Sequence, residues 1–224
     1  MFKKIASTLI ALAAPLAAAE FQGWEAMRVI QHDSAVTAIE KVDLYGDGRQ
    51  ALLLMNRKQS KIDIYRWLKP GERKEVKKNS ARPNDLPMAP DFIREEIVFD
   101  RLPLHLQAVN LDDDKTRELL ITTTNPLKLH RYDLQDGKWQ NTVSWKLKDE
   151  RVHRIDMLIL NNKAFISCFD GVQVIELKKG AKPQWLLPRE KNVSRLNWWL
   201  VDLNKDGQQD LVELISENGS SRLR

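Results

Sequence analysis

The sequence predicts an all-β fold, a β-propeller of four-stranded blades with four blades present. An apolar entry, an acidic turn and an apolar exit occur three times, in VDLYGDGRQALLL from Val42, VNLDDDKTRELLI from Val109 and VDLNKDGQQDLVEL from Val201. The first two copies are followed by two β-rich runs around a polar turn, and Trp-led runs recur later in the chain, such as the one from Trp139. A period in the mid-forties with four strands per unit is typical of propeller blades.

A fourth unit has the same pattern without the acidic turn. In RVHRIDMLILNNKAFISCFDGVQVIEL we interpret Asp156 as the equivalent of Asp43, Asn110 and Asp202, and its turn LILNNK cannot chelate an ion. The anchors then lie 67, 46 and 46 residues apart, and the first step is long because a polar insertion occupies residues 69–90. We expect blades around 31–68, 103–148, 151–187 and 194–224 within a propeller domain of residues 20–224.

The number of blades in the ring has two interpretations. A leading strand from Trp24 to Ile30 could complete the last unit and close a four-bladed ring. Alternatively the chain is part of a six- to eight-bladed propeller, which the end ENGSSRLR favours because it supplies no last outer strand.

The turn after Val201 has the composition of a calcium loop. Calcium takes six to eight oxygen ligands, and this loop offers carboxylate or amide oxygens at alternate positions, while Gly207 permits a sharp bend. The candidate ligands are Asp202, Asn204, Asp206, Gln208 and Asp210. The Asn110 turn is a second candidate, with Asn110, Asp112, Asp114 and Glu118. The ion is expected to be structural, because a filled coordination sphere leaves no open position for a substrate.

Two alternatives stay open for the Asp202 turn. It also satisfies the EF-hand pattern, with Glu213 at the twelfth position, which would make the chain an EF-hand-like calcium-binding protein. The runs that follow the other two turns are β-rich, however, where an EF-hand requires a helix. The second alternative is an Asx-turn, in which Asp and Asn side chains bond their own backbone and need no ion.

These residues resemble the FG-GAP/VCBS-repeat β-propellers, of the integrin-alpha-like and bacterial exported type. Blades of that family carry a D-x-[DN]-x-D-G-x-x-D-[LI] calcium loop between the innermost strand and the next. The Asp202 copy matches throughout, the Asn110 copy has Lys115 in place of glycine, and the Asp43 copy has Tyr45 and Ala51 in place of two ligands. The resemblance covers nearly all of the chain after residue 19 and implies a calcium-stabilised propeller. The Phe-Gly and Gly-Ala-Pro tags of the family are absent.

The N-terminus predicts export. Residues 1–19 have Lys3 and Lys4, an apolar core and a small-residue cleavage site before Glu20, which is the pattern of a secretory signal peptide. We therefore expect a periplasmic or secreted protein with no integral membrane segment. Loss of the two lysines changes the net charge from +5 to +3, a mild value that, with basic residues interleaved with acids, predicts no nucleic-acid partner.

Function is predicted to be binding rather than catalysis. No nucleophile elbow, phosphate loop, H-E-x-x-H helix or dinucleotide fingerprint occurs in the sequence. We expect a non-catalytic binding or adhesion scaffold with an extracellular protein or glycan on a propeller face; the alternative is the propeller portion of a larger secreted enzyme. The lone Cys168 is expected to be a small buried hydrophobe. Of the adjacent Trp198 and Trp199, one is expected to be exposed, because neighbouring strand residues point to opposite faces.

Overall fold

The computed structural model describes residues 30, 32, 35–68, 72, 92–112, 114–149, 156–188, 190–191 and 193–224. The predicted leader, the leading strand from Trp24, Asp113 and all of the insertion except Glu72 lie outside these residues. Within the described ranges the regular structure is entirely β, in fifteen strands. No helix in this part of the chain is long and apolar enough to cross a membrane. The prediction of an all-β chain is therefore confirmed for the described residues.

The strands form four antiparallel sheets in chain order. The first sheet holds β1 (Val36–Val42), β2 (Ala51–Asn56), β3 (Lys61–Trp67) and β4 (Phe92–Val98). The second holds β5 (Pro103–Val109), β6 (Glu118–Thr123), β7 (Lys128–Gln135) and β8 (Lys138–Lys146). The third holds β9 (Asp156–Leu160), β10 (Lys163–Cys168), β11 (Gly171–Glu176) and β12 (Gln184–Pro188), and the fourth holds β13 (Val193–Val201), β14 (Asp210–Glu217) and β15 (Ser220–Leu223).

Short turns set the register of several hairpins. Asp136-Gly137 joins β7 to β8 and Asn218-Gly219 joins β14 to β15, and all four residues have positive φ. Two-residue turns with positive φ at both positions match the twist of the flanking strands, which is why Asn-Gly and Asp-Gly sequences form hairpins. These pairs therefore determine locally which residues oppose each other across the strands.

The sheets pack face to face through two apolar cores. One core joins the first and second sheets and includes Leu53, Leu119 and Ile121; the other joins the second and third sheets and includes Leu120. Successive strand residues point to opposite faces, so β6 supplies Leu119 and Ile121 to one core and Leu120 to the other. The second sheet is thus buried on both faces, and every residue of β6 is buried.

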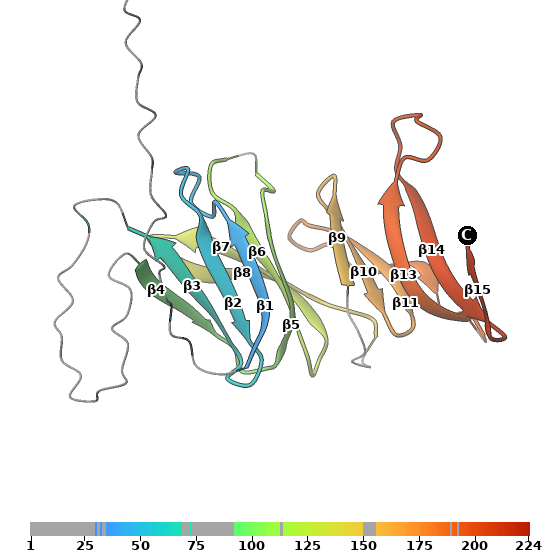
Figure 1. The fold of residues 1–224 in the computed structure, drawn as a ribbon, viewed down its shortest axis with the longest axis horizontal. Helices are drawn as coiled ribbons and strands as arrows, with labels where there is room; N and C mark the ends of the chain where they lie inside the picture. Colours follow the sequence, from blue (N-terminus) through green and yellow to red (C-terminus); the bar gives the residue numbers. More distant parts are fainter. Residues whose placement is uncertain are drawn as a thin grey trace, which may run out of the picture.

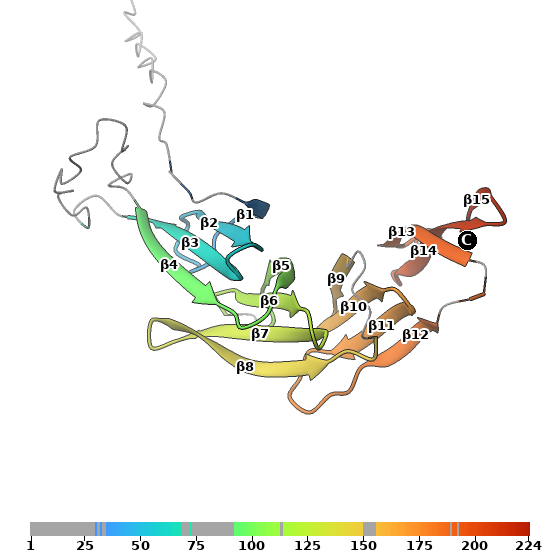
Figure 2. The same ribbon diagram turned by 90° about the horizontal axis from the view of Figure 1, so that it is seen from below.

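The sheets succeed one another along an open arc (Figures 1 and 2). Figure 2 shows the first strand of each sheet on the inner side of the arc and β4, β8 and β12 on the outer side. The first and fourth sheets lie at opposite ends of the row, and the described sheets do not form a closed ring.

Two predicted boundaries differ from the structure. The first sheet takes its fourth strand from Phe92–Val98, beyond the insertion, so this unit extends past residue 68. Asp156 is not the equivalent of Asp43, because it begins β9, whereas Asp43 follows β1. The corner of the third sheet is Asn161-Asn162, both with positive φ. A two-residue turn replaces the longer acidic loop there and shifts the position of the anchor.

Candidate functional site

The three acidic turns occupy the same place in three sheets. They connect β1 to β2, β5 to β6 and β13 to β14, so each joins the innermost strand of its sheet to the next strand. We call them the Asp43, Asn110 and Asp202 corners after their first residues. The Asp202 corner is almost wholly exposed to solvent.

The Asp43 and Asp202 corners close with the same hydrogen bonds. The two carboxylate oxygens of Asp43 accept from the backbone N–H groups of Asp47 (3.2 Å) and Gly48 (2.9 Å). Those of Asp202 accept from Asp206 (3.1 Å) and Gly207 (2.8 Å). The first carboxylate therefore fixes each loop by bonding to backbone four and five residues later. An Asx-turn in the strict sense bonds the backbone two residues later, and that spacing belongs to the middle acid of each corner.

A second shared bond involves the carboxylate in the middle of each corner. Oδ1 of Asp47 accepts from the backbone N–H of Arg49 (3.1 Å), and Oδ1 of Asp114 accepts from Thr116 (2.8 Å). Oδ1 of Asp206 accepts from Gln208 (2.8 Å). The middle acid caps the second half of the loop in all three copies.

The last acid of the motif bonds back to the start of the loop. Glu118 accepts from the backbone N–H of Leu111 (2.7 Å), and Asp210 accepts from that of Leu203 (3.1 Å). Ala51 stands at this position in the Asp43 corner and has no such group. Asn110 has no carboxylate, and its amide nitrogen instead donates to the carbonyl oxygen of Asp114 (2.9 Å). Only the Asp202 corner therefore has all three kinds of bond.

The corners differ in how their negative charge is balanced. In the Asp43 corner, Arg49 forms an ion pair with Asp47 and donates to the carbonyl oxygen of Trp67 (2.6 Å). In the Asn110 corner, Arg131 lies 2.5 Å from Asp112 and 3.7 Å from Glu118. Arginine thus offsets part of the negative charge in both corners.

The Asp202 corner has no such partner among the described residues. No described lysine, arginine or histidine lies within ion-pair distance of Asp202, Asp206 or Asp210, although Arg224 and Arg222 pair with other acids nearby in the sequence. The amide nitrogen of Asn204 donates to Asp206 (2.9 Å), and its oxygen accepts from the backbone N–H of Asp206 (3.0 Å). The side chain of Gln208 is exposed. The loop also contains Lys205, so its three aspartates and one lysine leave a net negative charge that no ion pair among the described residues neutralises.

The donor set of the Asp202 corner fits a hard cation by its chemistry. A carboxylate offers about four lone-pair sites, so an oxygen that accepts one backbone hydrogen bond can still bind an ion. In the described part of the chain, however, no three Asp, Glu, His or Cys side chains are already grouped around a metal-sized point. Binding at this corner would therefore require its carboxylates to converge from their present positions.

Burial raises the pKa of Glu118 above its ordinary value, against the opposing effects of the Leu111 N–H and Arg131. Glu118 is 4% exposed. A buried carboxylate with a backbone donor and an arginine nearby is less available to calcium than Asp210, which is only half-buried and has a backbone donor but no arginine.

The flanking strands exclude an EF-hand at the Asp202 corner. β13 and β14 stand where that motif requires helices. Glu213, the twelfth residue of the pattern, is buried and accepts from Arg224 (2.9 Å) rather than pointing into the loop.

The Asp43 corner packs directly against the Asn110 corner. The backbone N–H of Arg117 donates to the carbonyl oxygen of Leu44 (3.0 Å), and its Nε donates to that of Asp43 (3.2 Å). Gly46 has φ of +62°, and a Cβ added there would lie 1.9 Å from the carbonyl oxygen of Lys115. Sequence analysis did not single out Gly46 or Arg117, and only the glycine in a turn could have been noticed.

A polar groove of about 740 Å³ lies between the second and third sheets. Arg131 and Asp112 reach it from the second sheet, and Asn161, Asn162 and Lys178 reach it from the third. Its lining combines amides, hydroxyls and charges of both signs. Sequence analysis missed this groove, because it forms only where two distant units meet.

Two single-residue predictions concern side chains outside the corners. Trp198 is 4% exposed and Trp199 is 41% exposed, so one of the pair faces solvent as predicted. Cys168 is buried in the core between the second and third sheets. Burial raises the pKa of its thiol to about 12, which agrees with an inert apolar role.

Comparison with known proteins adds no assignment. No protein-family model matches the chain, and no match was found among the curated proteins with which it was compared. The likeness to the FG-GAP/VCBS repeats therefore rests on the corner motifs themselves.

Proposed function

We propose that this chain is an exported, non-catalytic binding scaffold built as a β-propeller arc, with a structural calcium ion at the Asp202 corner. The observation that carries the proposal is that three corners occupy the same place in three sheets and share the backbone hydrogen bond that the middle acid accepts. Equivalent sheets that pack in sequence around an inner row of first strands are the plan of a propeller.

The charge balance favours calcium at the third corner in particular. Three carboxylates lie within nine residues there against one lysine, Lys205, and none of them forms an ion pair among the described residues, whereas arginine pairs with acids of the other two corners. Exported proteins meet calcium near the dissociation constants of about 10⁻⁴ to 10⁻³ M that extracellular modules have. A bound ion would link β13 to β14 where the sequence supplies no salt bridge.

The polar groove between the second and third sheets is the preferred place for a partner. Loops on a rigid scaffold are common sites of binding, and the groove combines the adjacent amides of Asn161 and Asn162 with Arg131 and Lys178. Such a mixture of donors and acceptors suits a glycan or a polar loop of an extracellular protein.

Calcium titration of the thermal midpoint tests the proposal. Binding to the native state alone adds about 2.7 kcal/mol at a hundredfold excess over the dissociation constant. For a domain of this size the midpoint should rise by about 5–10 °C. Asp206→Asn should abolish the rise, whereas Asp47→Asn, in the arginine-paired corner, should leave it intact. An unchanged midpoint in the wild-type protein would mean that the Asp202 corner is an ion-free Asx-turn.

A further inference from the structure

One face of the fourth sheet carries an unusual amount of exposed apolar surface. We call this face, which includes Trp199 and Val201, the outer face of the fourth sheet. Leu203 is 66% exposed, Leu223 65%, Trp199 41% and Val201 39%, and they are four of the seven exposed large hydrophobic residues in the described part of the chain. Trp199 and Val201 are two residues apart on β13 and so share a face. Trp199 opposes Val212 on β14, and Leu214, two residues after Val212, opposes Leu223 on β15. The strand residues therefore share one face of the sheet.

The equivalent positions in the first two sheets are buried against the next sheet. Leu44 and Leu111 occupy the place of Leu203, one residue after the corner anchor, and they are 0% and 8% exposed. Val109 occupies the place of Val201 and is 7% exposed. The fourth sheet thus presents the surface that the first and second sheets use to join their neighbours.

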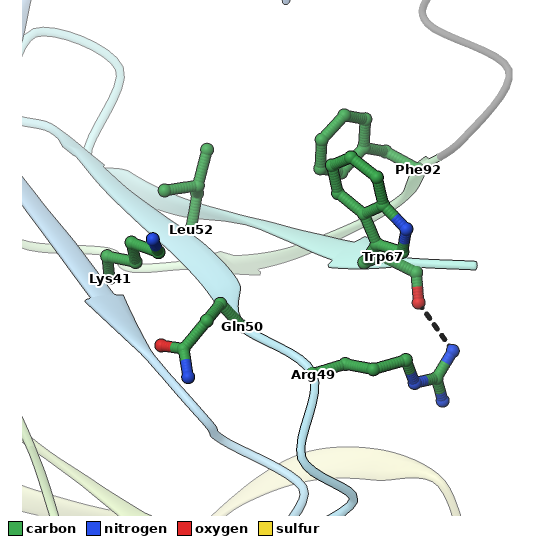
Figure 3. A pocket seen from close by; sticks show the side chains of 6 residues that line it. All are labelled: Lys41, Arg49, Gln50, Leu52, Trp67 and Phe92. Atoms are coloured by element: carbon green, nitrogen blue, oxygen red, sulfur yellow. Dashed lines mark hydrogen bonds between the residues drawn. The ribbon is translucent and has the colours of Figure 1, made fainter. Parts of the chain in front are cut away.

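The opposite end of the row has a matching hollow. A pocket of about 490 Å³ lies on the outer face of the first sheet, lined by Lys41, Arg49, Gln50, Leu52, Trp67 and Phe92 (Figure 3). Its equivalents on the second sheet follow from the registers. The pair Lys41 and Leu52 corresponds to the pair Ala108 and Leu119. The pair Trp67 and Phe92 corresponds to the pair Leu134 and Trp139.

Those equivalents receive the first sheet. Ala108, Leu119 and Trp139 pack in the same core as Leu44. Leu203 is therefore the equivalent of Leu44. The hollow around Leu52 is the equivalent of the second-sheet surface on which Leu44 packs.

Charge favours contact between the two faces. Leu203 belongs to the corner that has three aspartates against one lysine, Lys205, whereas the hollow carries the exposed Lys41. At the first junction, a base of the receiving sheet, Arg117, likewise donates to the Asp43 corner. The two faces lie at opposite ends of the arc, so they cannot meet within one molecule as it is arranged (Figures 1 and 2).

We propose that the outer face of the fourth sheet binds the outer face of the first sheet in a second copy of this chain, with Leu203 inserted in the hollow around Leu52. Such a head-to-tail contact is heterologous. We call the outer face of the fourth sheet the donor face and that of the first sheet the acceptor face. A dimer leaves one face of each kind unused, so further copies can add. The contact continues the sheet-to-sheet packing of the first two junctions across the boundary between molecules. It goes beyond the proposed function and does not require the calcium ion.

Sedimentation velocity over a concentration series in EDTA tests this contact. The wild-type protein should associate, and Leu203→Lys and Leu52→Glu should each raise the dissociation constant by about tenfold or more. Mixing the two variants should restore a dimer with one copy of each, because each keeps the face that the other lacks. Leu186→Lys, which changes an exposed residue (42%) on β12 of the third sheet and so belongs to neither face, should associate as the wild type does.

Several results would overturn the proposal. A wild-type protein that stays monomeric would overturn it, whether or not other segments of the chain cover the two faces. Continued association of Leu52→Glu would indicate pairing between two fourth sheets instead. A mixture of folded variants that does not pair would exclude the head-to-tail contact. Circular dichroism of each variant establishes folding, and Leu223→Lys provides a second donor-face change if Leu203→Lys does not fold.

Discussion

Gly46→Ala is the substitution that most directly perturbs the junction between the first two sheets. The added Cβ would lie 1.9 Å from the carbonyl oxygen of Lys115 and 2.5 Å from its carbonyl carbon. Both are backbone atoms of the neighbouring corner, which is held in place by the hydrogen bond from Arg117 to Leu44. The overlap cannot be relieved by turning a side chain, so the two corners must move apart.

We expect Gly46→Ala to lower the free energy of unfolding by about 2–5 kcal/mol. About 1–2 kcal/mol comes from placing a Cβ on left-handed backbone, since φ is +62°. About 1–3 kcal/mol comes from overpacking of the junction. At about 2–4 °C per kcal/mol for a domain of this size, the thermal midpoint should fall by about 4–20 °C.

Gly48→Ala is the matched control for this substitution. Its φ is +81°, and a Cβ there would meet nothing within 4 Å, so only the backbone cost of about 1–2 kcal/mol applies. Urea unfolding followed by circular dichroism gives both free energies. Equal losses for the two alanine variants would refute the reasoning, because they would show that the Asp43 and Asn110 corners do not touch.

Two further predictions concern packing and pH. Leu44→Ala should cost about 2–5 kcal/mol in urea unfolding because Leu44 is fully buried, whereas Leu203→Ala in the monomer should stay within about 0.5 kcal/mol; equal losses would contradict the exposure of Leu203. Burial lowers the pKa of His130 from its ordinary value of 6.5 to about 4. Between these two values the unfolded state binds more protons than the folded state. The free energy of unfolding should therefore fall as the pH is lowered from about 6.5 to about 4. His130→Asn should flatten this part of the pH profile relative to the wild type, and identical slopes would refute the assignment.

The repeat was predictable because its signals are local. Alternating apolar residues specify strands, and Asp or Asn at fixed spacing specifies the corner, so the Asn110 and Asp202 turns were placed correctly between their strands. The same local logic failed at Asp156. There a two-residue Asn161-Asn162 turn replaces the corner, and an isolated aspartate in the preceding segment has no turn signal to place it.

The remaining features depend on residues distant in the sequence. β4 was missed because the insertion separates it from β3, although Phe92 opposes Trp67 as Trp139 opposes Leu134. The pairing of Arg131 with Asp112 joins β7 to a corner nineteen positions earlier. No periodicity or spacing rule predicts such a contact, since it requires the sheet to be assembled first.

A crystal structure grown in calcium would test the central claim most directly, through anomalous scattering at the three corners. We predict a calcium ion at about 2.3–2.6 Å from oxygens of Asp202, Asn204 and Asp206, and none beside Asp47, where Arg49 stands. An Asp202 corner that keeps only its backbone hydrogen bonds at saturating calcium would contradict the account.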